Sequence, residues 1–109
     1  MIEVREYISV DGSCPYAKWF NGLNAEAAAK VTIAITRISH GNLSNVKSVG
    51  AGVHEYTIDF GPGYRIYLGR DGQRLVILLG GGTKKRQQND IEAAAALWKE
   101  YKSRKKKEG

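Results

Sequence analysis

The segment LVILLGGGTKKRQQNDI, residues 75–91, joins an apolar run to three glycines, a cationic loop and the polar start of a helix. A continuous apolar run of this length is typical of a strand buried on both faces, so we expect a central strand here. Lys84, Lys85 and Arg86 follow directly, which predicts a cluster of positive charge at one sheet edge, suited to a polyanion. The alternative is a strand that leaves the sheet through small residues into a solvated basic loop.

The glycines of this segment do not match two common nucleotide-binding patterns. A phosphate-binding P-loop requires a lysine directly after its last glycine, whereas Thr83 follows Gly82. The dinucleotide-binding pattern requires a glycine where this sequence has Lys85. We therefore expect no nucleotide cofactor at this turn.

Alternating apolar and polar residues precede the segment and predict a meander. The period-two pattern indicates three strands, at residues 53–60, 64–70 and 74–80. Gly61-Pro62-Gly63 separates the first two, and Asp71-Gly72, a strong signal for a tight hairpin turn, separates the last two.

The middle strand of this meander divides its side chains between two faces. Arg65 and Tyr67 lie on the face opposite an apolar set, so we expect both of them to face solvent. The preceding strand places Glu55, Thr57 or Asp59 across from Arg65. Arg65 then either forms an exposed ion pair, worth under about 1 kcal/mol, or is held ready for a phosphate.

A strand and a helical hairpin are predicted before the meander. The β-rich opening indicates a strand at about residues 2–9, and Pro15 suits the first turn of a helix. Asn24 can cap a second helix that ends at Gly41, and the short link between the two helices predicts an antiparallel hairpin. Residues 42–52, rich in Asn, Ser, Gly and Lys, are expected to form a loop.

The last helix is predicted to begin near Asn89 or Asp90. The complete order is β-α-α-β-β-β-α, which predicts an α+β fold in which an antiparallel sheet packs against a helical hairpin and a C-terminal helix. We expect residues 1–101 to form a single domain. Residues 102–109 carry five positive charges and one negative charge, and we expect them to form a basic, disordered tail.

Composition predicts a soluble, unexported protein of the cytoplasm. A chain of 109 residues with 42% hydrophobic content can bury a modest core. No apolar run approaches the length of a membrane span, and the first residues lack a signal-sequence pattern. Cys14, the single cysteine, fits a reducing compartment and has no thiolate-stabilising motif beside it. The C-terminal tail supplies +4 of the net charge of +6, and its like-signed charges would strengthen a non-specific, salt-sensitive attraction to nucleic acid.

The residues from Gly52 to Tyr101 resemble the second half of a known family. The turn and strand GPGYRIY, and the glycines that run into Thr83-Lys84-Lys85 and Gln87 before a helix, are similar to the RelE/ParE superfamily of small bacterial toxins. Within it they resemble the HigB-like, phage-type addiction module killer proteins. The helical hairpin of the first half is compatible, so the resemblance covers nearly the whole chain up to Tyr101.

The resemblance implies the toxin of a type II toxin–antitoxin system, a ribosome-dependent mRNA endoribonuclease held inactive by a small helix-turn-helix antitoxin. Such enzymes are metal-independent: a ribose 2′-hydroxyl attacks the adjacent phosphate and leaves a cyclic phosphate. Arg65 would stabilise charge on the phosphorane. Lys84 or Lys85 would activate the 2′-hydroxyl or stabilise charge, and Arg86 and Gln87 would position the RNA backbone.

Four other residues bear on the implied site. Tyr67 is a candidate RNA contact because it shares the strand face of Arg65. His54 is a candidate RNA contact, or a substitute acid or base, although its apolar strand face favours a structural role. Thr57 stands where family members often carry an arginine. Tyr101 falls on the packed side of its helix, so it is no clear counterpart of the C-terminal tyrosine that stacks on RNA in some relatives.

Two other functions stay open. A ParE-like DNA gyrase inhibitor binds a protein and cleaves no RNA, and the cluster of Lys84–Arg86 with Arg65 speaks against it. A non-catalytic basic module that binds RNA or a regulator would lose binding in rough proportion to the charge removed, with no activity to lose.

Overall fold

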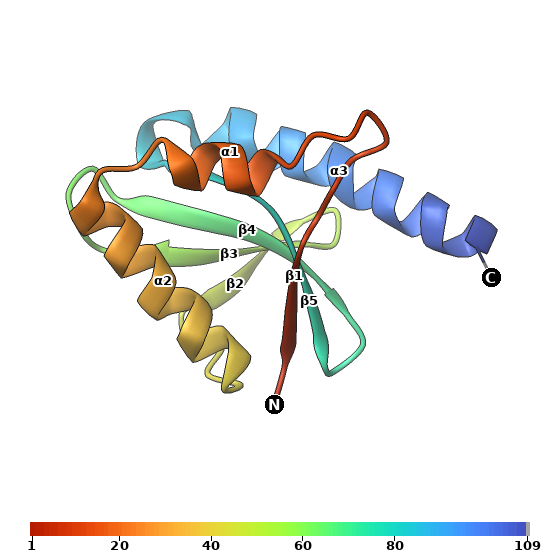
Figure 1. The fold of residues 1–109 in the computed structure, drawn as a ribbon, viewed down its shortest axis with the longest axis horizontal. Helices are drawn as coiled ribbons and strands as arrows, with labels where there is room; N and C mark the ends of the chain where they lie inside the picture. The colour runs from red at the N-terminus through yellow and green to blue at the C-terminus, as the bar shows by residue number, and fades with distance from the viewer. Residues whose placement is uncertain (109) are drawn as a thin grey trace.

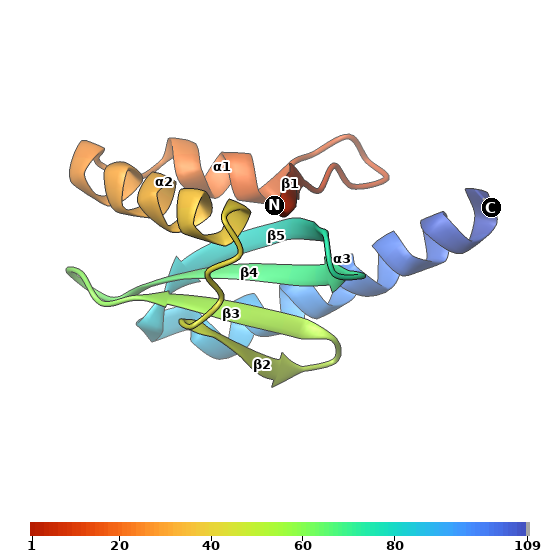
Figure 2. The same ribbon diagram turned by 90° about the horizontal axis from the view of Figure 1, so that it is seen from below.

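The computed structural model describes residues 1–108 as an α+β fold in which one five-stranded sheet lies between two helical layers (Figures 1 and 2). The helices α1 and α2 cover one face, and α3 crosses the other. Within the described chain, no helix combines the length and the apolar character needed to cross a membrane. The elements in chain order are β1 (Glu3–Glu6), α1 (Pro15–Asn21), α2 (Ala25–Ser39), β2 (Val46–Gly50), β3 (Val53–Ile58), β4 (Tyr64–Asp71), β5 (Leu75–Thr83), the 3-10 turn η1 (Lys84–Arg86) and α3 (Gln87–Glu108).

The sheet is mixed, with strand order β1-β5-β4-β3-β2. The antiparallel meander β3-β4-β5 is confirmed. The prediction of an entirely antiparallel sheet is wrong, because β1 pairs with β5 in parallel, from Glu3 opposite Leu75 to Glu6 opposite Leu78. β4 is the middle strand, whereas β5 lies between β1 and β4, and its apolar run is buried on both faces as predicted.

The segment predicted as a loop over residues 42–52 contains an edge strand. β2 pairs antiparallel with β3, and the register shifts between Ser48 and Gly50. Only two apolar residues mark this strand, and they serve different layers: Val46 packs on the side of α2 and Val49 on the side of α3. A strand with one apolar contact on each face carries no visible alternation, which is why the sequence pattern misses it.

The helical hairpin is confirmed, including its caps. Pro15 begins α1, and the side chain of Asn24 accepts a hydrogen bond of 2.9 Å from the Ala27 amide at the start of α2. Val31 and Ile38 of α2 are fully buried against Ile66 and other residues on one face of the sheet. A separate core on the opposite face joins α3 to the sheet and includes the residues Tyr7, Val53, Tyr67, Ile77, Leu79, Ala94 and Trp98.

A β-bulge decides which way the glycines of β5 face. One extra residue, Leu79, lies in β5 between the residues that pair with Tyr67 and Leu68. An extra residue reverses the alternation beyond it. Gly81 therefore faces α1, and Gly82 faces α3.

Side chains from both helical layers lie directly on these two glycines. A Cβ atom added to Gly81 would collide with the ring of Trp19, and one added to Gly82 would collide with the carboxylate of Asp90. The glycines thus permit close approach of helices to the strand, which is a packing role and not the cradling of a phosphate.

The last helix is longer at both ends than predicted. It begins at Gln87, directly after η1, so Asn89 lies inside the helix and does not cap it. The expectation of a disordered tail is wrong for residues 102–108, which continue α3, and Gly109 lies outside the described residues. Arg104 donates a hydrogen bond of 2.7 Å to the Ile8 carbonyl, and Lys105 pairs with Asp71. These contacts, with lysines at a helix C-terminus, favour the helical state.

Candidate nucleic-acid interface at the exit of β5

Arg65 and Tyr67 were predicted to face solvent, but the structure encloses both of them. α3 covers their face of the sheet, so the Arg65 side chain is only 11% exposed and Tyr67 is fully buried. The sequence pattern identified the two faces correctly but could not show that both are covered. From the sequence alone, a strand face that carries an arginine is expected to be exposed to solvent, because the buried residue that neutralises the arginine is not apparent.

Glu55 is that residue, and its whole side chain is buried. Its Oε1 lies 3.2 Å from Nε of Arg65 and accepts a hydrogen bond of 2.8 Å from Nε2 of Gln87. Its Oε2 lies 3.6 Å from Nζ of Lys47. The exposed, weak ion pair considered from the sequence is thus a buried one, in which breaking one partner leaves an uncompensated charge. Gln87, predicted to position RNA, is committed to Glu55.

The register explains why the partner of Arg65 could not be chosen from the sequence. Thr57 stands directly opposite Arg65, and Glu55 stands opposite Tyr67. The ion pair is therefore diagonal across the two strands, a distance that a long side chain spans. Alternation alone left Glu55, Thr57 and Asp59 equivalent.

The cluster around Glu55 retains unused hydrogen-bonding capacity. Within residues 1–108, Nε and Nη1 of Arg65 and the hydroxyl of Tyr67 are buried without a hydrogen-bond partner. Burial, reinforced by the carboxylates of Glu55 and Asp90, raises the pKa of Tyr67 far above its ordinary value. Among the described residues, Tyr67 is therefore a neutral phenol with a free donor, and Nη1 of Arg65 is a buried donor without a partner, while Oε2 of Glu55 is a buried acceptor without one.

Lys84 meets Arg65 at the β3–β4 turn. The Lys84 amide donates a hydrogen bond of 3.0 Å to the Gly63 carbonyl. A Cβ at Gly63 would lie 3.7 Å from both Nη1 of Arg65 and Cβ of Lys84. Lys85 and Arg86, the rest of η1, are exposed beside them. The chain thus brings one enclosed and three exposed cations to the end of the sheet where β5 leaves it.

Asp90 lies beside this cluster on the first turn of α3. Burial raises its pKa above the ordinary value of 3.8, and the positive charge of Arg86 partly offsets that effect. A cavity of about 720 Å³ between α1 and the exit of β5 is lined by Trp19, Gly82, Arg86 and Asp90, among others. The cavity is wide enough for a nucleotide-sized group, but Asp90 opposes an anion at its base.

His54 belongs to a different layer from the other predicted site residues. It pairs with Leu68 in β3–β4 and lies on the α2 side of the sheet, opposite to the face of Arg65. Its Nδ1 is buried without a hydrogen-bond partner in the part of the chain that the structure describes. The structure does not bring His54 together with Arg65, so it cannot act with it on one phosphate.

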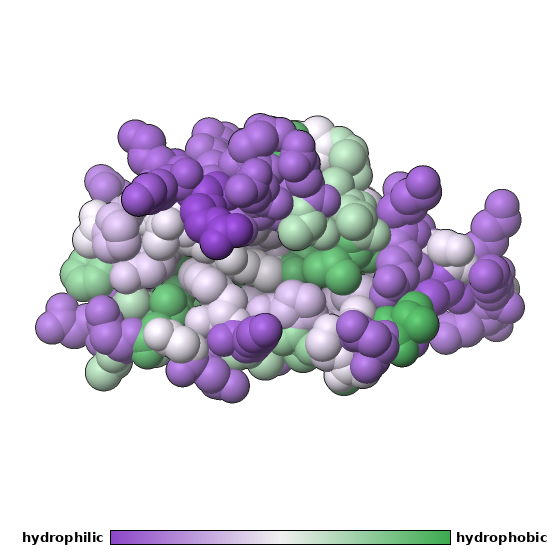
Figure 3. All heavy atoms as spheres, turned by 90° about the horizontal axis from the view of Figure 1, so that it is seen from above, coloured by the Kyte–Doolittle hydropathy of each residue, from purple (hydrophilic) through white to green (hydrophobic). Residues whose placement is uncertain are grey.

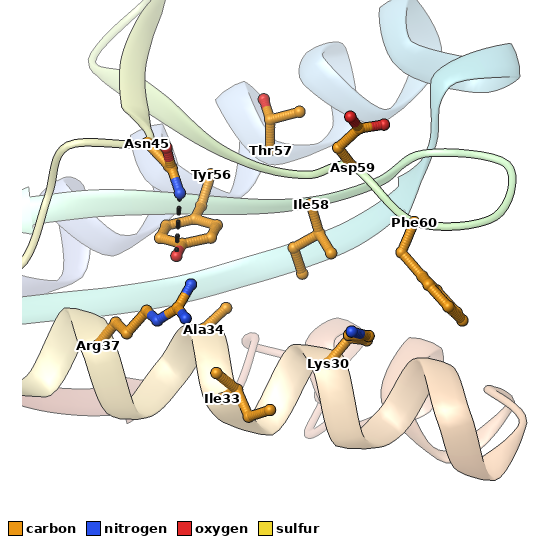
Figure 4. A pocket seen from close by; sticks show the side chains of 10 residues that line it. All are labelled: Lys30, Ile33, Ala34, Arg37, Asn45, Tyr56, Thr57, Ile58, Asp59 and Phe60. Carbon is orange, nitrogen blue, oxygen red and sulfur yellow. Dashed lines mark hydrogen bonds between the residues drawn. The ribbon is translucent and has the colours of Figure 1, made fainter.

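A second pocket lies on that α2 side and has a cavity volume of about 230 Å³. Lys30 and Arg37 extend from α2 toward β3, as Figure 4 shows, and Asp59 and Phe60 come from the end of β3. Nζ of Lys30 lies 5.2 Å from the centre of the Phe60 ring, and Asn45 donates a hydrogen bond of 3.4 Å to the Tyr56 hydroxyl. Its cations are partly balanced by Asp59, so it is the weaker anion site.

The donor sets suited to a metal ion are not assembled in residues 1–108, where no three His, Cys, Asp or Glu residues cluster. Cys14 lies apart from the cations, and its thiol contacts Glu6 at 3.5 Å. The side chains at the exit of β5 carry guanidinium, ammonium and phenol groups, with the carboxylates of Glu55 and Asp90 beside them.

Comparisons with known proteins give one informative relative. No protein-family model matches the sequence. An uncharacterized protein of Haemophilus influenzae is 40% identical over 94 residues, which cover 85% of this chain and 95% of that protein. Identity of this extent over nearly all of the relative establishes common ancestry, and the chain belongs to the same family as this Haemophilus influenzae protein.

Proposed function

We propose that this protein is the toxin of a type II toxin–antitoxin system and a metal-independent, ribosome-dependent mRNA endoribonuclease. The proposal includes a RelE-like topology, a cognate helix-turn-helix antitoxin and a cytoplasmic site of action. The observation that carries it is the meeting of Arg65 and Lys84 at the Gly63 turn, from positions far apart in sequence. Basic residues that start from one turn, with Lys85 and Arg86 beside them, suit a phosphate that gains charge in a transition state.

Each residue has a definite part in this proposal. Arg65 contacts the scissile phosphate through the exposed part of its side chain and stabilises the phosphorane. Lys84 or Lys85 takes the proton from the ribose 2′-hydroxyl, whose oxygen then attacks the adjacent phosphorus. The 5′-oxygen of the next nucleotide leaves and takes up a proton, which yields a cyclic phosphate and a free 5′-hydroxyl. Arg86 binds the flanking RNA backbone.

Glu55 and Tyr67 are positioning residues in this scheme. Glu55 holds the guanidinium of Arg65 from one side, so the remaining N–H groups keep a fixed direction. Tyr67 stays protonated at neutral pH and offers a hydroxyl near the same place. Preorganised donors lose little freedom when a phosphate binds, which favours transition-state stabilisation.

A non-catalytic RNA-binding module is the rival that one observation favours. Because Arg65 is mostly buried and paired with Glu55, an entirely structural role would leave only Lys84, Lys85 and Arg86 at the surface. Three exposed cations bind RNA without cleaving it.

The deciding experiment is inducible expression in bacteria followed by primer-extension mapping of transcripts. Lys84→Ala and Lys85→Ala are the variants to use, because both residues are exposed and the fold does not depend on them. Lys99→Ala, exposed in the middle of α3, is the matched control. We expect translation-dependent cuts that Lys84→Ala or Lys85→Ala removes and Lys99→Ala retains.

Three outcomes would replace the proposal. Growth arrest with intact transcripts and inhibited gyrase would support the ParE-like function. RNA binding in vitro without any cuts would support the non-catalytic module. Cuts that persist in the Lys84→Ala, Lys85→Ala double variant would show that neither lysine takes part in the chemistry.

A further inference from the structure

Another basic pocket, separate from the two cavities described above, lies far from the exit of β5, where the last turns of α3 pass the β4–β5 turn. Its cavity volume is about 460 Å³, and its lining residues are Arg70, Asp71, Trp98, Tyr101, Lys102, Lys105 and Lys106. The end of the molecule that carries the C-terminus of α3 is mostly hydrophilic on the face seen in Figure 3. We refer to these seven residues as the α3-end pocket.

The charge of the α3-end pocket is strongly unbalanced. Four of its residues are cationic and only Asp71 is acidic, and Asp71 already accepts hydrogen bonds from Tyr101 and Lys105. Arg70, Lys102 and Lys106 form no ion pair within residues 1–108. A protein with a net charge of +6 thus gathers three uncompensated cations around one cavity.

The floor of the α3-end pocket is aromatic and rigid. The rings of Trp98 and Tyr101 stack at 5.0 Å between centres, with 8° between their planes. The indole is held on its other side by the backbone of Gly69, where a Cβ would collide with the ring. Nζ of Lys102 lies 6.0 Å from the centre of the Trp98 ring. Both faces of the buried Trp98 indole are thus covered, so the pocket offers a ligand the edges of the two rings, bordered by cations.

We propose that the α3-end pocket binds the sugar–phosphate backbone of RNA, as a docking surface separate from the cations of η1. The choice of RNA as the polyanion rests on the proposed function, and the pocket's chemistry agrees with it. Lys102, Lys106 and Arg70 contact the phosphates, and the ribose packs against the exposed edges of the aromatic rings. An acidic protein segment supplies negative charge without the regularly spaced phosphates that three neighbouring cations can contact.

The distance between the two cationic regions allows the docking surface and η1 to contact different parts of an RNA substrate. Lys102 follows Arg86 by sixteen positions, which along a helix is about 24 Å at 1.5 Å per residue. RNA held at the α3-end pocket keeps the protein on a large substrate while a separate strand is engaged at η1. Docking of this kind raises the local concentration of the second site.

The test is RNA binding by two charge-matched variants. Lys102→Glu with Lys106→Glu alters the pocket, and Lys99→Glu with Lys107→Glu alters two exposed lysines of the same helix outside it. Lys105 is left unchanged because it anchors α3 to Asp71. Circular dichroism verifies the helix content of both variants. Binding is followed by fluorescence anisotropy of a fluorescein-labelled RNA hairpin across a salt series.

We expect the pocket variant to raise the Kd at least about tenfold and to lower the slope of log Kd against log salt by about 1.5, as for two lost phosphate contacts. The control variant should change the Kd less than about threefold. Equal losses in the two variants would overturn the inference, because they would show diffuse attraction and no site. Absence of hairpin binding by the unaltered protein, or binding of phosphatidylserine vesicles in its place, would also overturn it.

The result separates this inference from the proposed function. Transcript cuts with normal hairpin binding by the pocket variant would sustain the endoribonuclease and overturn the docking surface. If the protein binds the hairpin through the pocket but cuts no transcript, the docking surface would stand and the endoribonuclease would be overturned.

Discussion

Nε of Arg65 lies 3.2 Å from Oε1 of Glu55, and the side chain of Glu55 has no exposed surface. Replacing Glu55 with Gln keeps the shape of the side chain but leaves the guanidinium of Arg65 buried without its counter-charge. We expect a loss of about 3–5 kcal/mol in the free energy of unfolding, measured by urea denaturation. Glu92→Gln, on the exposed side of α3, is the control. A loss below about 1 kcal/mol would show that solvent reaches the pair.

Removing both partners of this ion pair should cost less than the sum of the single changes. In the double variant Glu55→Gln, Arg65→Gln, no unpaired charge remains in the interior, whereas each single variant leaves one. A double-mutant cycle by urea denaturation should therefore give a favourable coupling energy of about 1–3 kcal/mol. Strict additivity would mean that Lys47 and Gln87, and not Arg65, hold Glu55.

Alanine at Gly81 should destabilise the fold through a steric clash. Its Cβ would overlap the ring of Trp19, which lies flat on the strand. Overpacking of this kind costs about 1–3 kcal/mol, measurable as a lower melting temperature. Gly22→Ala is the control, since a Cβ there lies 3.5 Å from the nearest atom, an ordinary contact. Equal melting temperatures for the two variants would show that α1 can shift away from the sheet.

The last turns of α3 should detach from the sheet in acid. Hydrogen bonds from Lys105 and Tyr101 lower the pKa of Asp71 below its ordinary value of 3.8. A lowered carboxyl pKa contributes stability above the unfolded value, and that contribution is lost as pH falls through the folded-state pKa. The protection factors of the amides in residues 100–108, which correct for the slower intrinsic exchange in acid, should therefore fall below about pH 4. In Asp71→Asn, exchange should be faster at neutral pH and respond less to acid, and an unchanged acid response would point to Glu100.

The thiol of Cys14 should react slowly. Burial raises the pKa of Cys14 above its ordinary value of 9.0, and the Glu6 carboxylate adds to the increase. Since the thiolate is the nucleophile, alkylation by iodoacetamide at pH 7 should be slower than in the urea-unfolded protein. Glu6→Gln should increase the rate modestly. A rate equal to that of the unfolded chain would show that the N-terminal part of α1 opens freely.

Local patterns predicted the elements whose determinants are close in sequence. The meander, the helical hairpin and the Asn24 cap each depend on residues within a few positions of one another. The parallel pairing of β1 with β5 and the edge position of β2 depend on partners far along the chain, which periodicity does not encode.

The candidate site, like the fold, was predicted only where its determinants are close in sequence. Lys84, Lys85 and Arg86 are exposed at the exit of β5, as their polar run indicates. The burial of Arg65 was missed because α3 and the diagonal partner Glu55 both come from outside its strand. Placing an arginine therefore requires the strand register and the covering helix, not the alternation of its own strand.

The pairing of β1 with β5 has a consequence for the order of events during synthesis. A growing chain makes β1 first but cannot pair it until β5 exists, and the Tyr7 hydroxyl can donate its hydrogen bond to Glu100 only after most of α3 is made. The meander has short loops and low contact order, so it can form earlier. The first strand translated is then among the last to be placed, and the fold closes only when its final helix has been translated.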